Sequence, residues 1–139
     1  MIKILTPNDA DVILKLQHQT PSRNWSAAEA EKLLSRDWVT AFGLKVDGTF
    51  IGLCVLKIIE SEAEILELAI DNPHRKKGCA RQLWNHVQKT FPKSTFFLEV
   101  SEYNIPAIKF YEEMEFKNIG CRKDYYRPGE SALVYKIIN

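Results

Sequence analysis

A two-residue turn signal at Asp47-Gly48 constrains the fold of this chain more than any other feature. It separates two runs with the composition of strands, residues 40–46 and 49–59, and Asp-Gly favours a type I′ turn because both central residues need positive φ. A third run of this kind follows at residues 63–70. The pattern predicts an antiparallel meander. It excludes a doubly wound parallel sheet, because the strands of such a sheet need long crossover connections.

Helices and strands alternate in the rest of the chain. Helix starts are indicated by Thr6-Pro7 and by the capping box formed by Ser26 and Glu29. The strand at 95–100 carries apolar residues on both faces, so we expect it in the middle of a sheet. The elements predicted outside the meander are a strand at 1–5, helices at 6–19, 26–35, 78–91 and 104–115, and strands at 95–100, 116–122 and 132–138, the last two joined by a loop at 123–131. This order predicts one mixed α/β sheet with flanking helices, in a single domain that covers residues 1–139.

The composition is that of a soluble globular domain. The chain has 139 residues, of which 45% are apolar and 27% charged, and its net charge of +1 favours neither nucleic acid nor a membrane surface as a partner. It has no apolar run long enough to cross a bilayer, and its first residues lack the apolar segment of a signal peptide. The cysteines and histidines are scattered, so we expect no disulfide framework and no metal, and a cytoplasmic location. The oligomeric state stays open.

Three basic residues, Arg75, Lys76 and Lys77, stand directly before Gly78 at the start of a predicted helix. The dipole of a helix repels cations at its start, so basic side chains are useful there when an anion binds. The unpaired backbone N–H groups of the first turn form a natural anion site, and small residues let a phosphate approach them. A solvated basic turn is the structural alternative.

Two stretches resemble motifs of the GNAT family of N-acetyltransferases. Residues 75–80, Arg-x-x-Gly-x-Ala, resemble the acetyl-CoA pyrophosphate loop of that family. Residues 98–116, LEVSEYNIPAIKFYEEMEF, resemble the signature of its RimI-type branch, although Glu115 stands where that branch usually has Gly. Arg122 to Tyr126 resemble the R-x-x-Y-Y run of the branch, and residues 24–26 resemble the P-W-S entry to its second helix. The predicted order of elements is also the order found in the family.

The resemblance implies direct transfer of an acetyl group from acetyl-CoA, as co-substrate, to an amine, without a metal. Glu99 takes the place of the general base that removes a proton from the amine, and Tyr111 that of the general acid that protonates the leaving thiolate. Asn104, Ile108 and Tyr111 follow one another at helical spacing, so they share one stripe of the helix, from which Tyr111 can face the co-substrate.

The resemblance also assigns binding residues. The implied acceptor is a protein N-terminal α-amine, most specifically the N-terminal alanine of a small-subunit ribosomal protein, and its peptide is expected to lie against Trp25, Tyr125 and Tyr126. The residues implied for acetyl-CoA are Leu68, Ala69 and Ile70 at the reacting carbonyl oxygen, Arg75, Lys76, Lys77, Gly78, Cys79, Ala80 and Arg81 at the pyrophosphate, and Asn104 at the pantetheine arm.

Alternatives remain for each of these assignments. Glu99 has a structural alternative as the partner of a lysine, Tyr111 as a core tyrosine, and Tyr125 and Tyr126 as core residues. Glu64 and Glu67 are competing carboxylates in the strand before the basic loop, with Glu64 near the position from which histone-type branches take their base. The acceptor has alternatives in a lysine side chain, a polyamine or another small amine. A non-catalytic acetyl-CoA-binding module is disfavoured because Glu99 and Tyr111 are both present, and an RNA-binding domain because the strand at 95–100 lacks basic residues.

Overall fold

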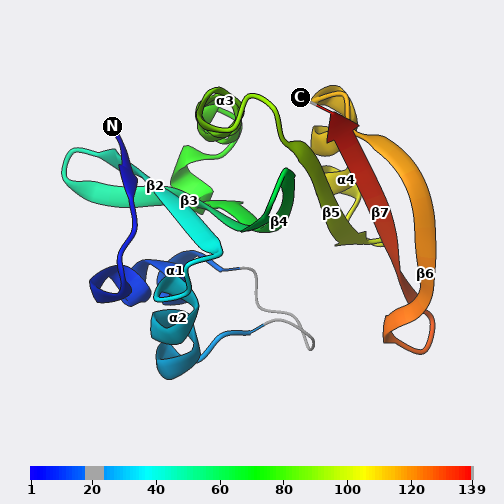
Figure 1. The fold of residues 1–139 in the computed structure, drawn as a ribbon, viewed down its shortest axis with the longest axis horizontal. Helices are drawn as coiled ribbons and strands as arrows, with labels where there is room; N and C mark the ends of the chain where they lie inside the picture. Colours follow the sequence, from blue (N-terminus) through cyan, green and yellow to red (C-terminus); the bar gives the residue numbers. More distant parts are fainter. Residues whose placement is uncertain (18–23, 139) are drawn as a thin grey trace.

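The computed structural model, which describes residues 1–17 and 24–138, contains a seven-stranded mixed sheet in the order β1-β2-β3-β4-β5-β7-β6 (Figure 1). This arrangement confirms the predicted fold class. The strands are β1 Ile2–Ile4, β2 Val39–Val46, β3 Thr49–Ile59, β4 Glu62–Ile70, β5 Thr95–Ser101, β6 Lys117–Arg127 and β7 Glu130–Ile138. The helices are α1 Ala10–Leu16, α2 Ala27–Leu34, α3 Cys79–Thr90 and α4 Ile105–Glu113, with short 3₁₀ turns η1 at Pro7–Asp9 and η2 at Asn72–His74.

The meander predicted from the turn signal is confirmed. Strands β1 to β4 pair in sequence order, each antiparallel to the next. Asp47 and Gly48 have φ values of 51° and 79°, as the type I′ turn requires. The turn therefore sets the register of β2 on β3, and with it the positions of the strands that follow.

Local capping decides where the first two helices begin. Thr6 precedes η1, and its backbone N–H donates to Oδ2 of Asp9 at 2.8 Å. Ser26 caps α2 with the predicted box: the Glu29 N–H donates to Oγ of Ser26 at 3.1 Å, and the Ser26 N–H donates to Oε1 of Glu29 at 3.0 Å. These hydrogen bonds, chiefly the one from the Ser26 backbone, lower the pKa of Glu29. Helix α1 ends at Leu16, before the predicted end at residue 19; residues 18–23 lie outside the described ranges.

Two layers of helices cover the sheet, each over its own apolar core. The core under α1 and α2 includes Ile13, Leu53 and Val55. The core on the other face lies under α3 and α4 and contains Leu83 and Leu98. In this second core an aromatic cluster joins α3 to β5 and to the chain that follows α4. The Trp84 ring centroid lies 4.9 Å from that of Phe96 and 5.2 Å from that of Phe116.

The sheet splits between β4 and β5. These two strands run parallel, but they pair at only three positions, the last of which joins Glu64 to Phe97 (Figure 1). A bulge in β4 contributes to the divergence, because Leu56 opposes Ile65 while Val55 opposes Glu67. Beyond the paired positions, the facing backbone N–H and C=O groups of the two strands are not bonded to each other, so they are available to another partner.

The predicted loop at 123–131 is wrong. Strand β6 continues to Arg127 and β7 begins at Glu130, so only two residues form the turn. Arg122 opposes Ala132 and Arg127 opposes Glu130, which leaves three extra residues on β6 as a bulge. A run that contains Pro and Gly and few apolar residues is typical of a loop, and hydrogen bonds with residues distant in sequence hold it here as a bulged edge strand.

Candidate active site

The basic loop lies between the end of β4 and the start of α3. Its first turn is fastened by a short contact of 2.6 Å between Nδ1 of His74 and Oδ1 of Asp71. The side chain of Arg75 folds back, and its Nε donates to the backbone oxygen of Ile70 at 2.9 Å. Arg75 therefore ties the loop to the strand end, while Lys76, Lys77 and Arg81 are exposed.

The backbone of this loop is shaped as an anion site. Gly78 is the N-cap of α3 with a φ of 81°, and it supplies no side chain to cap the first N–H groups of the helix. A Cβ atom built on Gly78 would meet nothing within 4 Å, so the space in front of the helix start is open. Uncapped N–H groups at the start of a helix of this length attract phosphate groups. Cys79 and Ala80, also assigned to this loop, are half-buried in the first turn of α3.

Glu99 lies on β5, two residues beyond the last position that pairs with β4. Its side chain is only 14% exposed, and its Oε2 lies 3.0 Å from Nε of Arg122 on β6. This oxygen is buried and accepts no hydrogen bond, so the contact with Arg122 is one of charge alone. The alternative that Glu99 pairs with a cation is thus correct in kind, but the cation is an arginine.

Tyr111 reaches the region from α4. It is half-buried, and its ring meets those of Phe110 and Phe116 edge-on at 5.5 and 5.6 Å. It packs on the core that contains Leu98, whereas Glu99 alternates with Leu98 along β5 and points to the other face. Tyr111 and Glu99 therefore lie on opposite faces of the sheet.

Asn104 is the N-cap of α4, as predicted: its Oδ1 accepts a hydrogen bond from the N–H of Ala107 at 3.3 Å. Leu68, Ala69 and Ile70 form the last part of β4, which has left β5 and remains paired with β3. The residues predicted to contact acetyl-CoA thus border the diverging part of the sheet or the start of α3.

The three residues predicted to contact the acceptor peptide come from two different parts of the structure. Tyr125 and Tyr126 lie in the β6 bulge with ring centroids 5.3 Å apart, and the guanidinium carbon of Arg122 is 5.8 Å from the Tyr125 ring centroid. Trp25 packs against the α1–α2 core, and its backbone exchanges two hydrogen bonds with the side chain of Gln17, at 2.8 and 2.9 Å. Glu99, Arg122 and the pair Tyr125–Tyr126 therefore form one continuous row of contacts. Arg122 was not assigned to the site from the sequence.

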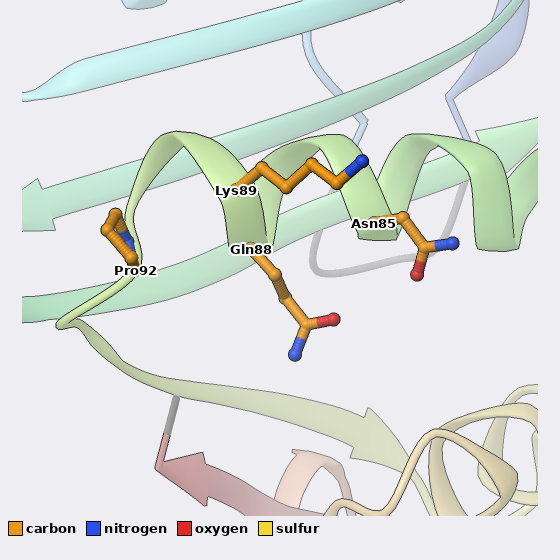
Figure 2. Close-up of a pocket in the computed structure, with 4 residues that line it drawn as sticks. All are labelled: Asn85, Gln88, Lys89 and Pro92. Atoms are coloured by element: carbon orange, nitrogen blue, oxygen red, sulfur yellow. The ribbon is translucent and has the colours of Figure 1, made fainter.

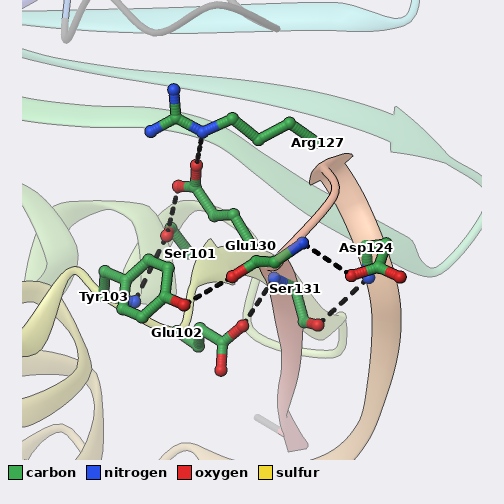
Figure 3. Close-up of polar contacts among 8 residues, drawn as sticks. Ser101, Glu102, Tyr103, Asp124, Arg127, Glu130 and Ser131 are labelled. Atoms are coloured by element: carbon green, nitrogen blue, oxygen red, sulfur yellow. Dashed lines mark hydrogen bonds and ion pairs between the residues drawn. The ribbon is translucent and has the colours of Figure 1, made fainter.

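Polar contacts hold the tip of the β6–β7 hairpin against the end of β5 (Figure 3). Glu130 accepts hydrogen bonds from Oγ of Ser101 at 2.6 Å and from Nε of Arg127 at 2.7 Å. The backbone N–H of Ser131 donates to Oε2 of Glu102 at 2.7 Å. The hydrogen bond from Ser101 lowers the pKa of Glu130; burial opposes this effect, and the hydrogen bond and charge of Arg127 add to it.

The competing carboxylates of β4 differ in burial. Glu64 is in the last pair with β5 and is half-buried, whereas Glu67 follows the bulge and is only 6% exposed. Its Oε1 accepts a hydrogen bond from the N–H of Leu68 at 3.2 Å. Because the extra residue in β4 changes the alternation of its side chains, the more deeply buried of the two carboxylates is Glu67, a difference that sequence spacing does not show.

A hollow on the surface of α3 lies away from these residues. It is lined by Asn85, Gln88, Lys89 and Pro92 at the C-terminal end of the helix (Figure 2). Gln88 is about 15 Å along the helix axis from Gly78, at 1.5 Å of rise per residue. Within residues 1–17 and 24–138, no three side chains of His, Cys, Asp or Glu gather to hold a metal, and no helix there is long and apolar enough to span a membrane.

The sheet thus splits beside the uncapped start of α3, and a nearly buried carboxylate, that of Glu99, lies next to the split. Residues 10–116 match the acetyltransferase (GNAT) family. The chain therefore belongs to that family, as its motifs predicted, and the predicted enzyme class of N-acetyltransferase is confirmed at this level.

Relatives support the same class. The chain is 26% identical to an N-alpha-acetyltransferase of Saccharolobus solfataricus, over 91% of the chain and 86% of that relative. It is 28% identical to the [ribosomal protein bS18]-alanine N-acetyltransferase of Escherichia coli, over 61% of the chain and 60% of that relative. It is also 28% identical to an uncharacterized protein of Mycobacterium leprae, over 97% of the chain. The chain spans 39% of the Mycobacterium protein, so two of these three relatives are matched over less than two thirds of their length.

Solved structures share the fold. The E. coli ribosomal-protein-S18-alanine N-acetyltransferase superposes with a TM-score of 0.85 at 23% identity, over 99% of this chain and 94% of that chain. NAA60 of Arabidopsis thaliana, solved in complex with acetyl-CoA, superposes with a TM-score of 0.80 at 19% identity, over 99% of this chain and 97% of that one. At these identities the likeness establishes the fold alone.

Proposed function

We propose that this chain transfers an acetyl group from acetyl-CoA to a protein N-terminal α-amine, most specifically the N-terminal alanine of a small-subunit ribosomal protein. The observation that carries the proposal is the buried Oε2 of Glu99, which accepts no hydrogen bond although it lies beside the split in the sheet. A nearly buried carboxylate oxygen that makes no hydrogen bond is costly even beside the charge of Arg122, and a role in proton transfer is one reason to keep it. The names of the Saccharolobus and E. coli relatives support an α-amine as acceptor.

The reaction proposed for these residues is a direct transfer. The acceptor arrives as an ammonium group, and Glu99 takes one of its protons, which leaves a lone pair on nitrogen. That nitrogen attacks the thioester carbonyl, and the C–S bond then breaks as the amide forms. The hydroxyl of Tyr111 gives its proton to the departing thiolate. The attacking nitrogen loses a second proton as the amide forms. Of the two protons that leave the ammonium group, the equivalent of one ends on the CoA thiol and the other is released to solvent, so Glu99 and Tyr111 return to their starting forms by proton exchange.

The backbone supplies the binding groups. We assign the developing charge on the carbonyl oxygen to the Leu68–Ile70 segment, whose N–H groups on the side away from β3 face the part of the sheet that β5 has left. We assign the pyrophosphate to the backbone of residues 76–81 at the start of α3, and the pantetheine arm to Asn104. We place the acceptor peptide along Tyr125 and Tyr126, and we expect Trp25 to contact it from the opposite side. No metal is needed for these steps, and the proposed location is the cytoplasm.

Mass spectrometry of acetylated peptides tests the acceptor. The protein and acetyl-CoA are mixed with peptides that begin with alanine, carry one internal lysine, and have a free or blocked α-amine. We expect acetylation of the free α-amine only. Acetylation of the lysine in both peptides would contradict the α-amine assignment and favour a lysine-directed enzyme. Binding of acetyl-CoA without any transfer would favour a binding module or another small amine.

Two substitutions test the chemistry. Glu99→Gln and Tyr111→Phe should each lower kcat by about 10² to 10⁴, the usual contribution of a general base or acid, while acetyl-CoA still binds. Glu113→Gln is the matched control for the first, because Glu113 is an exposed glutamate on α4. Full activity of Glu99→Gln would remove Glu99 from the mechanism and move attention to Glu67.

A further inference from the structure

Arg122 has no role in the transfer proposed above, yet its charge is paired with the candidate base. Its side chain is 59% exposed, whereas that of Glu99 is 14% exposed, and 3.0 Å separate Nε of Arg122 from Oε2 of Glu99. An ion pair between an exposed arginine and a nearly buried carboxylate adds little to the folding stability of the protein. Its position therefore calls for a reason other than stability.

The sheet register explains how Arg122 reaches Glu99. Glu99 opposes Val134 on β7, and Arg122 opposes Ala132, two residues further along the same face of β7. The Arg122 side chain therefore crosses β7 diagonally, which is within the reach of a long side chain. Since β7 lies between β5 and β6, the contact exists only when all three strands are assembled.

The geometry of the contact leaves the carboxylate free to react. Oε2 of Glu99 is buried and lies 3.0 Å from Nε of Arg122, so the guanidinium holds this oxygen and leaves Oε1 for a ligand. The attraction between opposite charges is stronger in a partly buried place than in water and keeps the carboxylate in position. Oε1 keeps its lone pairs, which can accept the proton of the amine.

Arg122 is itself held from the other side. Its guanidinium carbon lies 5.8 Å from the centroid of the Tyr125 ring, at which distance a cation is attracted to the ring face. The bulge that carries Tyr125 is fastened through Asp124, whose φ is 54°. The Asp124 N–H donates to Oγ of Ser131 at 3.1 Å, and its Oδ1 accepts from the N–H of Gly129 at 2.9 Å (Figure 3).

We propose that Arg122 is a positioning residue for the acetyl transfer: it holds the buried Oε2 of Glu99 by charge and so leaves Oε1, the other oxygen of the carboxylate, to take the proton of the acceptor amine. This inference rests on the proposed function. In the step concerned, an N–H bond of the ammonium breaks and an O–H bond forms on Glu99, while Arg122 keeps all its protons. Arg122 thus acts through Glu99 and not on the acetyl group.

A double-mutant cycle on kcat tests this role. Arg122→Ala should lower kcat by about 10- to 100-fold, part of the contribution of a general base, with the KM for acetyl-CoA unchanged within about twofold. In a Glu99→Gln background the same substitution should change kcat by less than about twofold, because residues that act as a unit are not additive. Arg122→Lys should recover most of the loss by restoring the charge, and Arg122→Gln should not.

Arg36→Ala is the matched control. Arg36 is also exposed and also stacks on an aromatic ring, that of Trp38 at 5.3 Å, and it should leave kcat unchanged. An active wild type in which Arg122→Ala changes kcat by less than about twofold, or by the same factor in both backgrounds, would overturn the role of Arg122 alone. A wild type that acetylates no amine would overturn the proposed function and this role together.

Discussion

Glu115 stands where the RimI-type signature of the GNAT family usually has Gly, and its backbone conformation is strained as a result. It ends α4 with a φ of 72°, a left-handed conformation that is unfavourable for residues with a Cβ. Its N–H donates to the oxygen of Glu112, and the next N–H, of Phe116, donates to that of Tyr111, both at 3.0 Å. These two bonds form the Schellman motif, in which Gly is the preferred residue at this position.

Glu115→Gly should therefore stabilise the protein. Relief of the left-handed strain contributes about 1–2 kcal/mol, and the greater freedom of Gly in the unfolded chain offsets about half of it, so we expect a gain of about 0.5–1 kcal/mol. Urea unfolding measures this difference. The same change two residues earlier, Glu113→Gly, falls on the last residue of α4, where the backbone is helical, and should instead cost up to about 1 kcal/mol. Destabilisation by both substitutions would contradict this account of the helix end.

At the scale of an element, the start of α3 combines a structural glycine with a binding surface. Gly78→Ala places a Cβ at a φ of 81° and in the open space before the helix, so it should both strain the backbone and obstruct a phosphate. Gly48→Ala is the control, because Gly48 has a φ of 79° and equally open surroundings in the β2–β3 turn. Both variants should lose about 1 kcal/mol of stability.

Only Gly78→Ala should weaken acetyl-CoA binding, by about tenfold, or about 1.4 kcal/mol. Isothermal titration calorimetry measures the two affinities. Equal affinities in the two variants would mean that the start of α3 does not bind the pyrophosphate.

The tip of the β6–β7 hairpin should respond to acid through Glu130. The hydrogen bond from Ser101 holds its pKa below the ordinary value of 4.5 in the folded protein. A lowered folded-state pKa means that the stabilising contribution is complete above the ordinary pKa and is lost as pH falls through the lowered one. Wild type should thus exceed Glu130→Gln in unfolding free energy at neutral pH, and the difference should shrink below about pH 4.5. A difference that is constant with pH would contradict this prediction.

At the scale of the whole molecule, the split between β4 and β5 leaves backbone groups available to a ligand that bridges the two halves of the sheet. Hydrogen exchange should therefore slow on acetyl-CoA binding in residues 66–70 and 76–81. At a concentration 100 times the Kd, the bound state gains about 2.7 kcal/mol, or about a hundredfold in protection. Strand β2, which lies away from the split and is paired on both sides, serves as the internal reference. Protection confined to β2 or to β6 would contradict the assigned site.

Features that are complete within a few residues of sequence were predicted correctly. The Asp47-Gly48 turn, the box between Ser26 and Glu29 and the Asn104 cap each satisfy their backbone requirements within four positions along the chain. Turns and caps depend on local dihedral angles and local hydrogen bonds, so residue type and spacing decide them. The enzyme class was predicted from the resemblance to family motifs, because the hydrophobic periodicity of a chain does not indicate which reaction it catalyses.

The sequence by itself therefore determined the order of the elements and most of their ends. Tertiary structure decided the rest: the divergence of β4 from β5, the burial of Glu67, the β6 bulge and the charge contact of Arg122 with Glu99. Each of these depends on side chains or strands brought together from distant positions, and their energies come from packing and pairing that exist only in the assembled sheet. A local pattern in the sequence does not contain them.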